Sequence, residues 1–198
     1  MTAEDHAGGV RERKRQQTRQ RIVEAGLGLF KAHGYEATTL DAIAAAAGIS
    51  RRTFFHYFKS KDEILLSMQA GLGEQLAAAI GREPQGKPPL ATLRDAMLGL
   101  VAPYAPDELL ALDKLMRSSE IVQARKQASY IKDEATIFAA LRQRWPEEPE
   151  PPLRLLASFA IATVRLSLDS FSREAGRRPL AALVRESFDA LERLTQRG

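Results

Sequence analysis

The stretch that decides the fold is Thr38–Leu65, TTLDAIAAAAGISRRTFFHYFKSKDEIL. Its apolar spacing predicts a short helix over residues 40–47 and a second over residues 51–58. Gly48 lies in the three-residue turn between them, and Ser50 is placed to cap the second helix. Two short helices joined by such a turn are typical of a helix-turn-helix.

The two predicted helices have one apolar face and one basic, aromatic face. The apolar side chains are spaced to pack on a preceding helix: Ile43, Ala44, Ala47, Ile49, Phe54 and Phe58. The opposite face of the second helix carries Arg51, Arg52, Thr53, Phe55, His56 and Tyr57. An α-helix fits the major groove of DNA, where arginine can bind guanine with a bidentate fork. The alternative is a helical corner without a DNA partner.

Working outward, a helix is predicted from about Arg11 to His33, and Gly34 is a suitable C-cap. Ser60–Glu63 forms a capping box that opens a long helix to about Ile80. Prolines separate the later helical stretches, predicted over residues 90–103, 107–117, 120–145, 153–175 and 180–196. The sequence therefore predicts an all-α chain of about nine helices.

Charge is unevenly distributed along the 198 residues. Residues 1–61 hold eleven Lys and Arg against six Asp and Glu, whereas the rest holds 18 against 19. A basic end on a neutral body indicates a polyanion that meets one end of the protein. The tract 11–21 either follows the phosphate backbone or enters the minor groove of DNA, or it is a solvated helix face.

Several classes of function are disfavoured by what the sequence lacks. It has no cysteine and three separated histidines, so we expect no metal site and no cofactor. It contains none of the common catalytic motifs, so we expect no enzyme. The apolar run Leu155–Leu168 is interrupted by Arg165, and we expect it to be too short for a membrane span of about 20 residues. A cytoplasmic protein without a membrane partner is the expectation.

The chain resembles the TetR family of bacterial transcription regulators in three ordered segments. These are LFKAHGY at residues 29–35, TTLDAIA at 38–44 and AGISRRTFFHYFKSKDEIL at 47–65. The resemblance covers about residues 16–76. It implies an all-helical homodimer with an N-terminal helix-turn-helix domain and a C-terminal domain that binds a small effector.

By this resemblance, six residues fall where the family contacts DNA: Thr39, Arg51, Arg52, Thr53, Tyr57 and Lys61. The family often has a phosphate-binding tyrosine where Phe55 stands, and Tyr57 is the nearby hydroxyl that can replace it. His56 is expected on the groove side of the same helix. The motif spans about residues 39–58.

The expected organisation has three parts. Residues 1–15 form a flexible basic arm, residues 16–76 the DNA-binding domain, and residues 77–198 the effector-binding and dimerisation domain. The last two helices are expected to pair with their copies in a homodimer. The effector pocket is expected among apolar residues of the C-terminal body: Met97, Leu100, Tyr104, Leu112, Met116, Tyr130, Phe138 and Phe159.

The most favoured function is a repressor that binds double-stranded operator DNA of pseudo-palindromic sequence. A small, mainly hydrophobic effector of unknown identity would release it. The alternatives are a ligand-independent regulator or an activator and, less favoured, a helical enzyme or a module for membrane surfaces.

Overall fold

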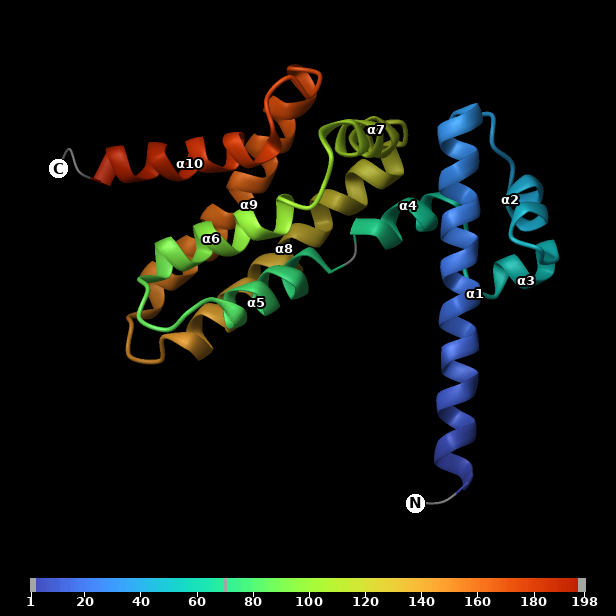
Figure 1. The fold of residues 1–198 in the computed structure, drawn as a ribbon, viewed down its shortest axis with the longest axis horizontal. Coiled ribbons are helices and arrows are strands. Elements are labelled where there is room, and N and C mark those ends of the chain that lie inside the picture. The colour runs from blue at the N-terminus through green and yellow to red at the C-terminus, as the bar shows by residue number, and fades with distance from the viewer. Residues whose placement is uncertain (1–2, 70, 196–198) are drawn as a thin grey trace. The chain divides into compact units, whose positions relative to one another are not determined.

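The computed structural model describes residues 3–69 and 71–195, and within them the chain forms ten α-helices and no strand (Figure 1). The all-α prediction is confirmed. In chain order the helices are α1 (Ala3–His33), α2 (Leu40–Ala46), α3 (Arg51–Phe55), α4 (Lys61–Gln69), α5 (Leu72–Arg82), α6 (Pro89–Val101), α7 (Pro106–Arg117), α8 (Glu120–Arg144), α9 (Glu150–Arg173) and α10 (Leu180–Thr195).

The helices divide into two compact units. Unit 1 comprises Met1–Met68 and Leu115–Val122, and unit 2 comprises Gln69–Lys114 and Gln123–Gly198. The first domain therefore ends eight residues earlier than position 76, and it includes a second segment from the α7–α8 junction. Sequence periodicity does not reveal this return, because it depends on buried contacts such as those of Met116 and Val122.

Unit 1 is built on α1, against which α2 and α3 pack. The side chains of Ile43, Phe54 and Phe58 are at most 1% exposed, as the apolar pattern predicts. Helix α1 begins at Ala3 instead of Arg11, so the segment expected as a flexible arm is helical from that residue on. Residues 3–10, AEDHAGGV, carry only one large apolar side chain, so no hydrophobic periodicity indicated where the helix starts.

One long helix was predicted from Ser60 to about Ile80, and this prediction is wrong. The structure has two helices there, α4 and α5, which raises the number of helices in the described chain to ten. Gly71 has a φ of 98°, in the left-handed region that a continuous right-handed helix cannot contain. Glycine adopts this conformation without the steric cost that a Cβ would bring.

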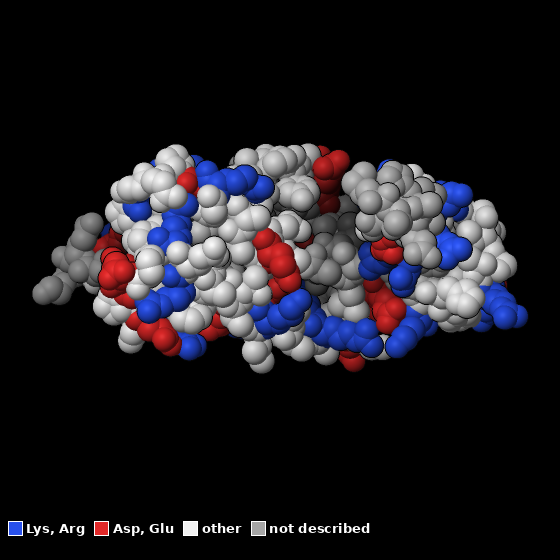
Figure 2. Space-filling view, turned by 90° about the horizontal axis from the view of Figure 1, so that it is seen from below, with Lys and Arg blue, Asp and Glu red and all other residues white. Residues whose placement is uncertain are grey.

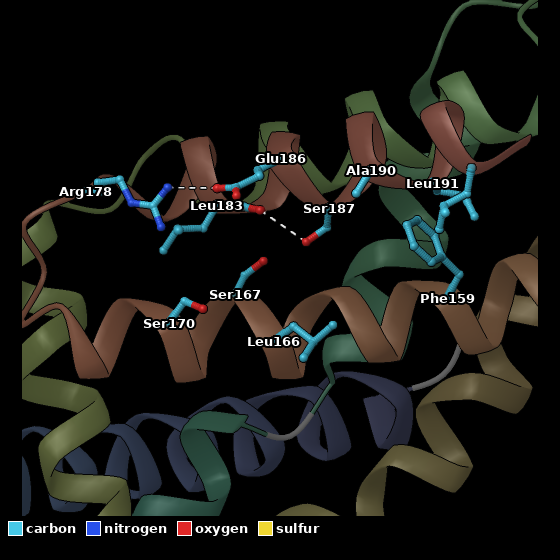
Figure 3. Close-up of a pocket in the computed structure, with 11 residues that line it drawn as sticks. Phe159, Leu166, Ser167, Ser170, Arg178, Leu183, Glu186, Ser187, Ala190 and Leu191 are labelled. Atoms are coloured by element: carbon cyan, nitrogen blue, oxygen red, sulfur yellow. Dashed lines mark hydrogen bonds and ion pairs between the residues drawn. The ribbon is translucent and has the colours of Figure 1, made fainter. Parts of the chain in front are cut away.

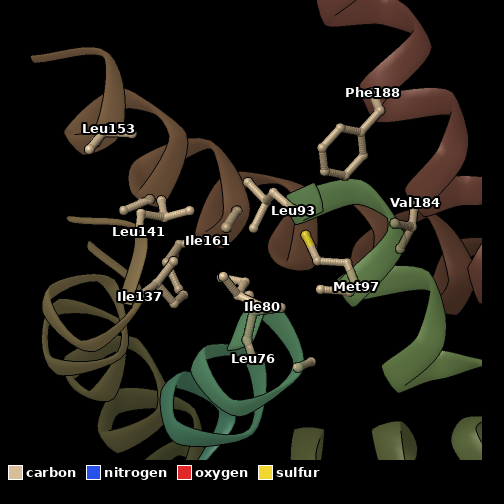
Figure 4. Packing of buried hydrophobic residues seen from close by; sticks show 14 of the residues in the cluster. Leu76, Ile80, Leu93, Met97, Ile137, Leu141, Leu153, Ile161, Val184 and Phe188 are labelled. Carbon is tan, nitrogen blue, oxygen red and sulfur yellow. The ribbon is translucent and has the colours of Figure 1, made fainter. Parts of the chain in front are cut away.

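Unit 2 encloses the largest apolar core (Figure 4). Its buried side chains come from α5, α6, α8, α9 and α10, and include Leu76, Leu93, Ile137, Ile161 and Phe188. Helix α5 approaches α8 closely: a Cβ added at Gly73 would lie 2.8 Å from the Cα of Asp133. The amide of Gly73 donates to Oδ1 of Asp133 at 3.1 Å, which satisfies an amide at the start of α5.

Helix α9 is more apolar than expected. Its 24 residues are long and apolar enough to cross a membrane by length and composition, which corrects the expectation drawn from the run Leu155–Leu168. The core helix of a soluble protein passes the same test. In this structure Ala157, Ala160 and Phe171 are fully buried within unit 2, so packing accounts for part of its apolar composition.

Candidate DNA-binding interface

The helix-turn-helix is held by short-range caps. The hydroxyl of Thr39 accepts from the amide of Ala42 at 3.1 Å, and the hydroxyl of Ser50 accepts from the amide of Thr53 at 3.1 Å. These caps satisfy amides at the first turns of α2 and α3, and the cap by Ser50 is the one that the sequence predicts. Gly48 has a φ of 66°, so the turn uses a conformation that favours glycine.

Helix α3 is shorter than predicted, since it ends at Phe55 and not near Phe58. The amides of His56 and Tyr57 donate to carbonyls three residues back, at 3.1 Å and 2.9 Å, so the chain tightens into a turn. His56 is therefore the C-cap, and Tyr57 lies beyond the helix. The tightened turn lets both Phe54 and Phe58 enter the core of unit 1.

The face of α3 that points away from this core is accessible. Arg51, Arg52 and His56 are exposed, Phe55 is 46% exposed, and Thr53 and Tyr57 are half-buried. An accessible face with guanidinium, hydroxyl and imidazole groups matches the donors and acceptors on base edges. The structure thus brings six of the predicted DNA-contacting residues to one short segment.

The two arginines at the start of α3 differ in their surroundings. The guanidinium of Arg51 pairs with Asp41 at 2.8 Å and lies 5.8 Å from the centre of the Phe55 ring. This exposed pair contributes little to stability, but it orients the side chain. Among the described residues, Arg52 has no ion-pair partner, and its guanidinium is exposed. Arg52 is therefore the cation of α3 most available for a base edge.

Lys61 is placed differently from the expectation of a phosphate contact. Its ammonium donates to the carbonyl oxygen of Tyr35 at 2.7 Å, and lies 3.4 Å from the carbonyl oxygens of Glu36 and Thr38. It also lies 4.2 Å from the centre of the Tyr35 ring. The ammonium joins the start of α4 to the loop between α1 and α2, and so a phosphate would have to share it with these carbonyls.

A polar cluster at the start of α4 ties together distant parts of unit 1. The carboxylate of Asp62 accepts from the hydroxyl of Tyr35, and from the hydroxyl of Ser119 at 2.6 Å. Burial opposes ionisation of Asp62, but the hydrogen bonds from Ser119, Tyr35 and Ser60 outweigh it and hold its pKa below the ordinary value. Burial and the adjacent carboxylate raise the pKa of Tyr35.

We expect Asp62→Ala to lower the free energy of unfolding by about 2 kcal/mol at pH 7, because two hydroxyls lose a charged acceptor. The pKa of Asp62 is depressed in the folded state, so its contribution is present above the ordinary value of 3.8. That contribution is lost as the pH falls through the lower folded-state pKa. Urea denaturation of both chains should therefore show a gap at pH 7 that narrows in acid.

Asp41→Ala is the matched control for this measurement, because Asp41 has an exposed arginine as its partner. We expect it to cost less than about 1 kcal/mol. An Asp62→Ala gap that stays constant from pH 7 into strong acid would show that the carboxylate charge is not the stabilising feature.

Sequence reasoning did not identify this cluster. Asp62 stands within the recognised capping box, where its neighbour Glu63 accepts from the amide of Lys59 at 2.7 Å. Ser119 precedes α8, and its hydroxyl accepts from the amide of Val122 at 3.3 Å. That N-cap position was the available signal, but nothing in the sequence relates it to a carboxylate 57 residues away.

Of the eight residues expected to line an effector pocket, five lie in or against one apolar cluster of unit 2. Met97 and Tyr130 are buried in the main core of unit 2, and Leu100, Phe138 and Phe159 pack against it. Met116 is buried in unit 1 instead. Of the two others, Leu112 is half-buried and Tyr104 is exposed.

A groove of about 400 Å³ lies between α9 and α10 (Figure 3). Apolar and hydroxyl side chains line it together with one ion pair, between Arg178 and Glu186 at 2.7 Å. Leu166 and Leu191 project at its sides, and Ser167 points into it from α9. The hydroxyl of Ser167 is buried and has no hydrogen-bond partner among the described residues.

Comparison with known sequences finds relatives of the N-terminal part. Residues 22–68 match the family described as bacterial regulatory proteins, tetR family. The transcriptional regulator TcmR of Streptomyces glaucescens is 36% identical over 105 residues, which cover 53% of this chain and 46% of TcmR. The repressor KstR of Rhodococcus jostii is 33% identical over 92 residues, covering 46% and 43%. The chain thus spans less than half the length of these relatives.

Comparison with solved structures extends over most of the chain. Thermus thermophilus FadR, a TetR-family repressor solved with lauroyl-CoA, has a TM-score of 0.53 and 26% identity, and the match covers 87% of this chain and 92% of FadR. SmeT, the repressor of a Stenotrophomonas maltophilia efflux pump, has a TM-score of 0.60 and 25% identity, covering 87% of each chain. The SmeT complex with triclosan supports the fold of this chain. It has 21% identity and a TM-score of 0.63, and the match covers 88% of this chain and 91% of SmeT.

Proposed function

We propose that this chain, whose residues 22–68 match the tetR family of bacterial regulatory proteins, is a sequence-specific DNA-binding regulator of transcription. The observation that carries the proposal is α3, whose exposed Arg52 has no ion-pair partner among the described residues. Its first turn is capped by Ser50, which orients the N-terminal residues of α3 for base edges in the major groove.

We propose that the regulator acts as a homodimer through α9 and α10. Support comes from three leucines on these helices that are largely exposed in one chain: Leu155 at 70%, Leu166 at 62% and Leu194 at 73%. Leu166 and Leu194 line the groove between the two helices. Because a two-fold interface is self-complementary, such a dimer would read a pseudo-palindromic operator with half-sites about 34 Å apart.

We further propose that the chain is a cytoplasmic repressor that a small, mainly hydrophobic effector releases. FadR was solved with lauroyl-CoA, which carries an apolar acyl chain, and SmeT was solved with triclosan. In this chain the pocket would lie beside the core of unit 2, near Leu100, Phe138 and Phe159. Release would be a population shift toward a conformer that spaces the two α3 helices wrongly for DNA.

Helix α8 offers a way for an effector in unit 2 to act on unit 1. Helix α8 starts in unit 1, where Val122 is buried, and continues into unit 2 from Gln123. Ser119, just before α8, donates to Asp62 at the start of α4. An effector that displaces α8 would therefore strain a hydrogen bond that holds the DNA-binding unit together.

Selection of the purified protein on random duplex DNA at about 0.15 M salt tests the proposal, since low salt inflates non-specific binding. We expect enrichment of an inverted repeat. To remove any releasing ligand, the protein is also unfolded, washed and refolded before a second selection. A folded dimer that enriches no sequence in either selection would refute the proposed function.

A further inference from the structure

The N-terminal half of α1 is an unusual helix. Residues 11–21, RERKRQQTRQR, contain no apolar side chain, so nothing in this segment drives it onto a protein core. Every side chain in it is exposed except that of Thr18, which is half-buried. Six of the eleven residues are Lys or Arg and one is Glu. The segment is therefore a solvated helix with a large excess of positive charge.

The spacing of these charges destabilises the helix when it stands alone. Arg15 lies four residues from both Arg11 and Arg19, and like charges at this spacing repel on a helix. Surface cations of unit 2 are arranged differently, since each of several lies beside a carboxylate. The pairs are Lys87 with Glu83, Lys132 with Glu74, Arg154 with Glu150, and Arg178 with Glu174. A polyanion would supply the counter-charge that the sequence of residues 11–21 lacks.

The C-terminal end of the segment lies beside Phe58, just beyond α3. The guanidinium carbon of Arg19 lies 5.0 Å from the centre of the Phe58 ring, three residues beyond α3. With a rise of about 1.5 Å per residue, Arg11 lies roughly 12 Å further along the α1 axis than Arg19. Both α1 and α3 belong to unit 1, so the basic segment extends from the same body that carries the exposed face of α3.

One side of the segment is hollowed. Lys14, Gln17, Thr18, Gln20 and Arg21 line a shallow polar depression of about 600 Å³. Lys14 and Arg21 are seven residues apart, which places them on one side of a helix two turns from each other. Figure 2 shows Lys and Arg side chains, together with some Asp and Glu side chains, on the right-hand part of the face that it draws. Two cations and amide side chains around a depression are suited to phosphate oxygens.

We propose that residues 11–21 are a second DNA-binding surface, which holds backbone phosphates of the duplex next to the half-site read by α3. The inference rests on the proposed function, and it assigns to this surface affinity without sequence information. A membrane surface fits less well, because an interfacial helix needs apolar side chains beside its charges and this segment has none.

The double variant Lys14→Gln/Arg21→Gln tests the proposal, since glutamine keeps a helix propensity similar to that of lysine and arginine. Each phosphate contact contributes about 0.9 to the slope of log K against log salt, so the slope should fall by about 1.8 per protomer. The ratio of operator affinity to random-duplex affinity should not change. Fluorescence anisotropy with both duplexes from 0.05 to 0.3 M salt, a range of about sixfold, measures both quantities.

Lys132→Gln/Arg154→Gln is the matched control, because it removes two surface cations from unit 2, and its slope should equal that of the wild type. Wild-type binding with an unchanged slope in the Lys14/Arg21 variant overturns this inference alone. If the Lys14→Gln/Arg21→Gln variant loses binding to anionic phospholipid vesicles while its duplex slope is unchanged, the segment binds membranes and the proposal is also overturned. A wild-type chain that binds no duplex overturns the proposed function as well.

Discussion

Leu166→Glu is expected to convert the protein into a monomer and to weaken operator binding by at least about a hundredfold. Leu166 is 62% exposed in the single chain, so its replacement by a good helix former should leave the folded chain intact. In a two-fold interface the substitution places a carboxylate from each copy in an apolar contact, where charge is costly to desolvate. A monomer would contact one half-site and lose the contribution of the other.

Light scattering coupled to size exclusion measures the oligomeric state, and anisotropy measures operator affinity. Ile131→Glu is the matched control, since Ile131 on α8 is 79% exposed and does not line the groove. This control should remain a dimer with wild-type affinity. A dimeric Leu166→Glu variant with unchanged operator binding would move the interface away from α9.

Arg52→Ala is expected to weaken operator binding by about 1–3 kcal/mol for each half-site. Over two half-sites this is a loss of roughly 30-fold to 2 × 10⁴-fold. Arg52 is exposed, stands at the second position of α3 and has no ion-pair partner among the described residues, so it is available for a bidentate contact with guanine. Affinity for random DNA should fall far less, because that binding depends on phosphates.

Arg52→Lys separates the two contributions of this side chain. Lysine keeps the charge but lacks the planar fork, so the variant should lose base selectivity while the salt dependence of binding is preserved. Competition between operator and scrambled duplexes measures the selectivity. Equal losses on both duplexes in Arg52→Ala would show that Arg52 contacts phosphate and not a base.

Local structure was the most predictable level of this protein. The cap by Ser50, the turn at Gly48 and the burial of Phe54 all appear where the sequence places them. Each depends on residues within a few positions of one another, so backbone hydrogen bonding and helical periodicity suffice to predict them. The later helices also lie within three residues of their predicted bounds.

The errors arise where tertiary contacts or a single backbone conformation override periodicity. The apolar pattern runs through Gly71 without interruption, yet its left-handed φ divides α4 from α5. The pattern also continues α3 to Phe58, although the chain tightens after Phe55.

The sequence alone therefore determined the helix-turn-helix, the basic face of α3, the charge excess of residues 11–21 and the all-α class, because each is encoded in neighbouring residues. Only the tertiary structure decided that Lys61 donates to the 35–38 carbonyls, that Ser119 reaches Asp62, and that α9 and α10 border a groove. These features join residues that are tens of positions apart. Such contacts form only when packing brings distant segments together, and no local pattern encodes which side chains will meet.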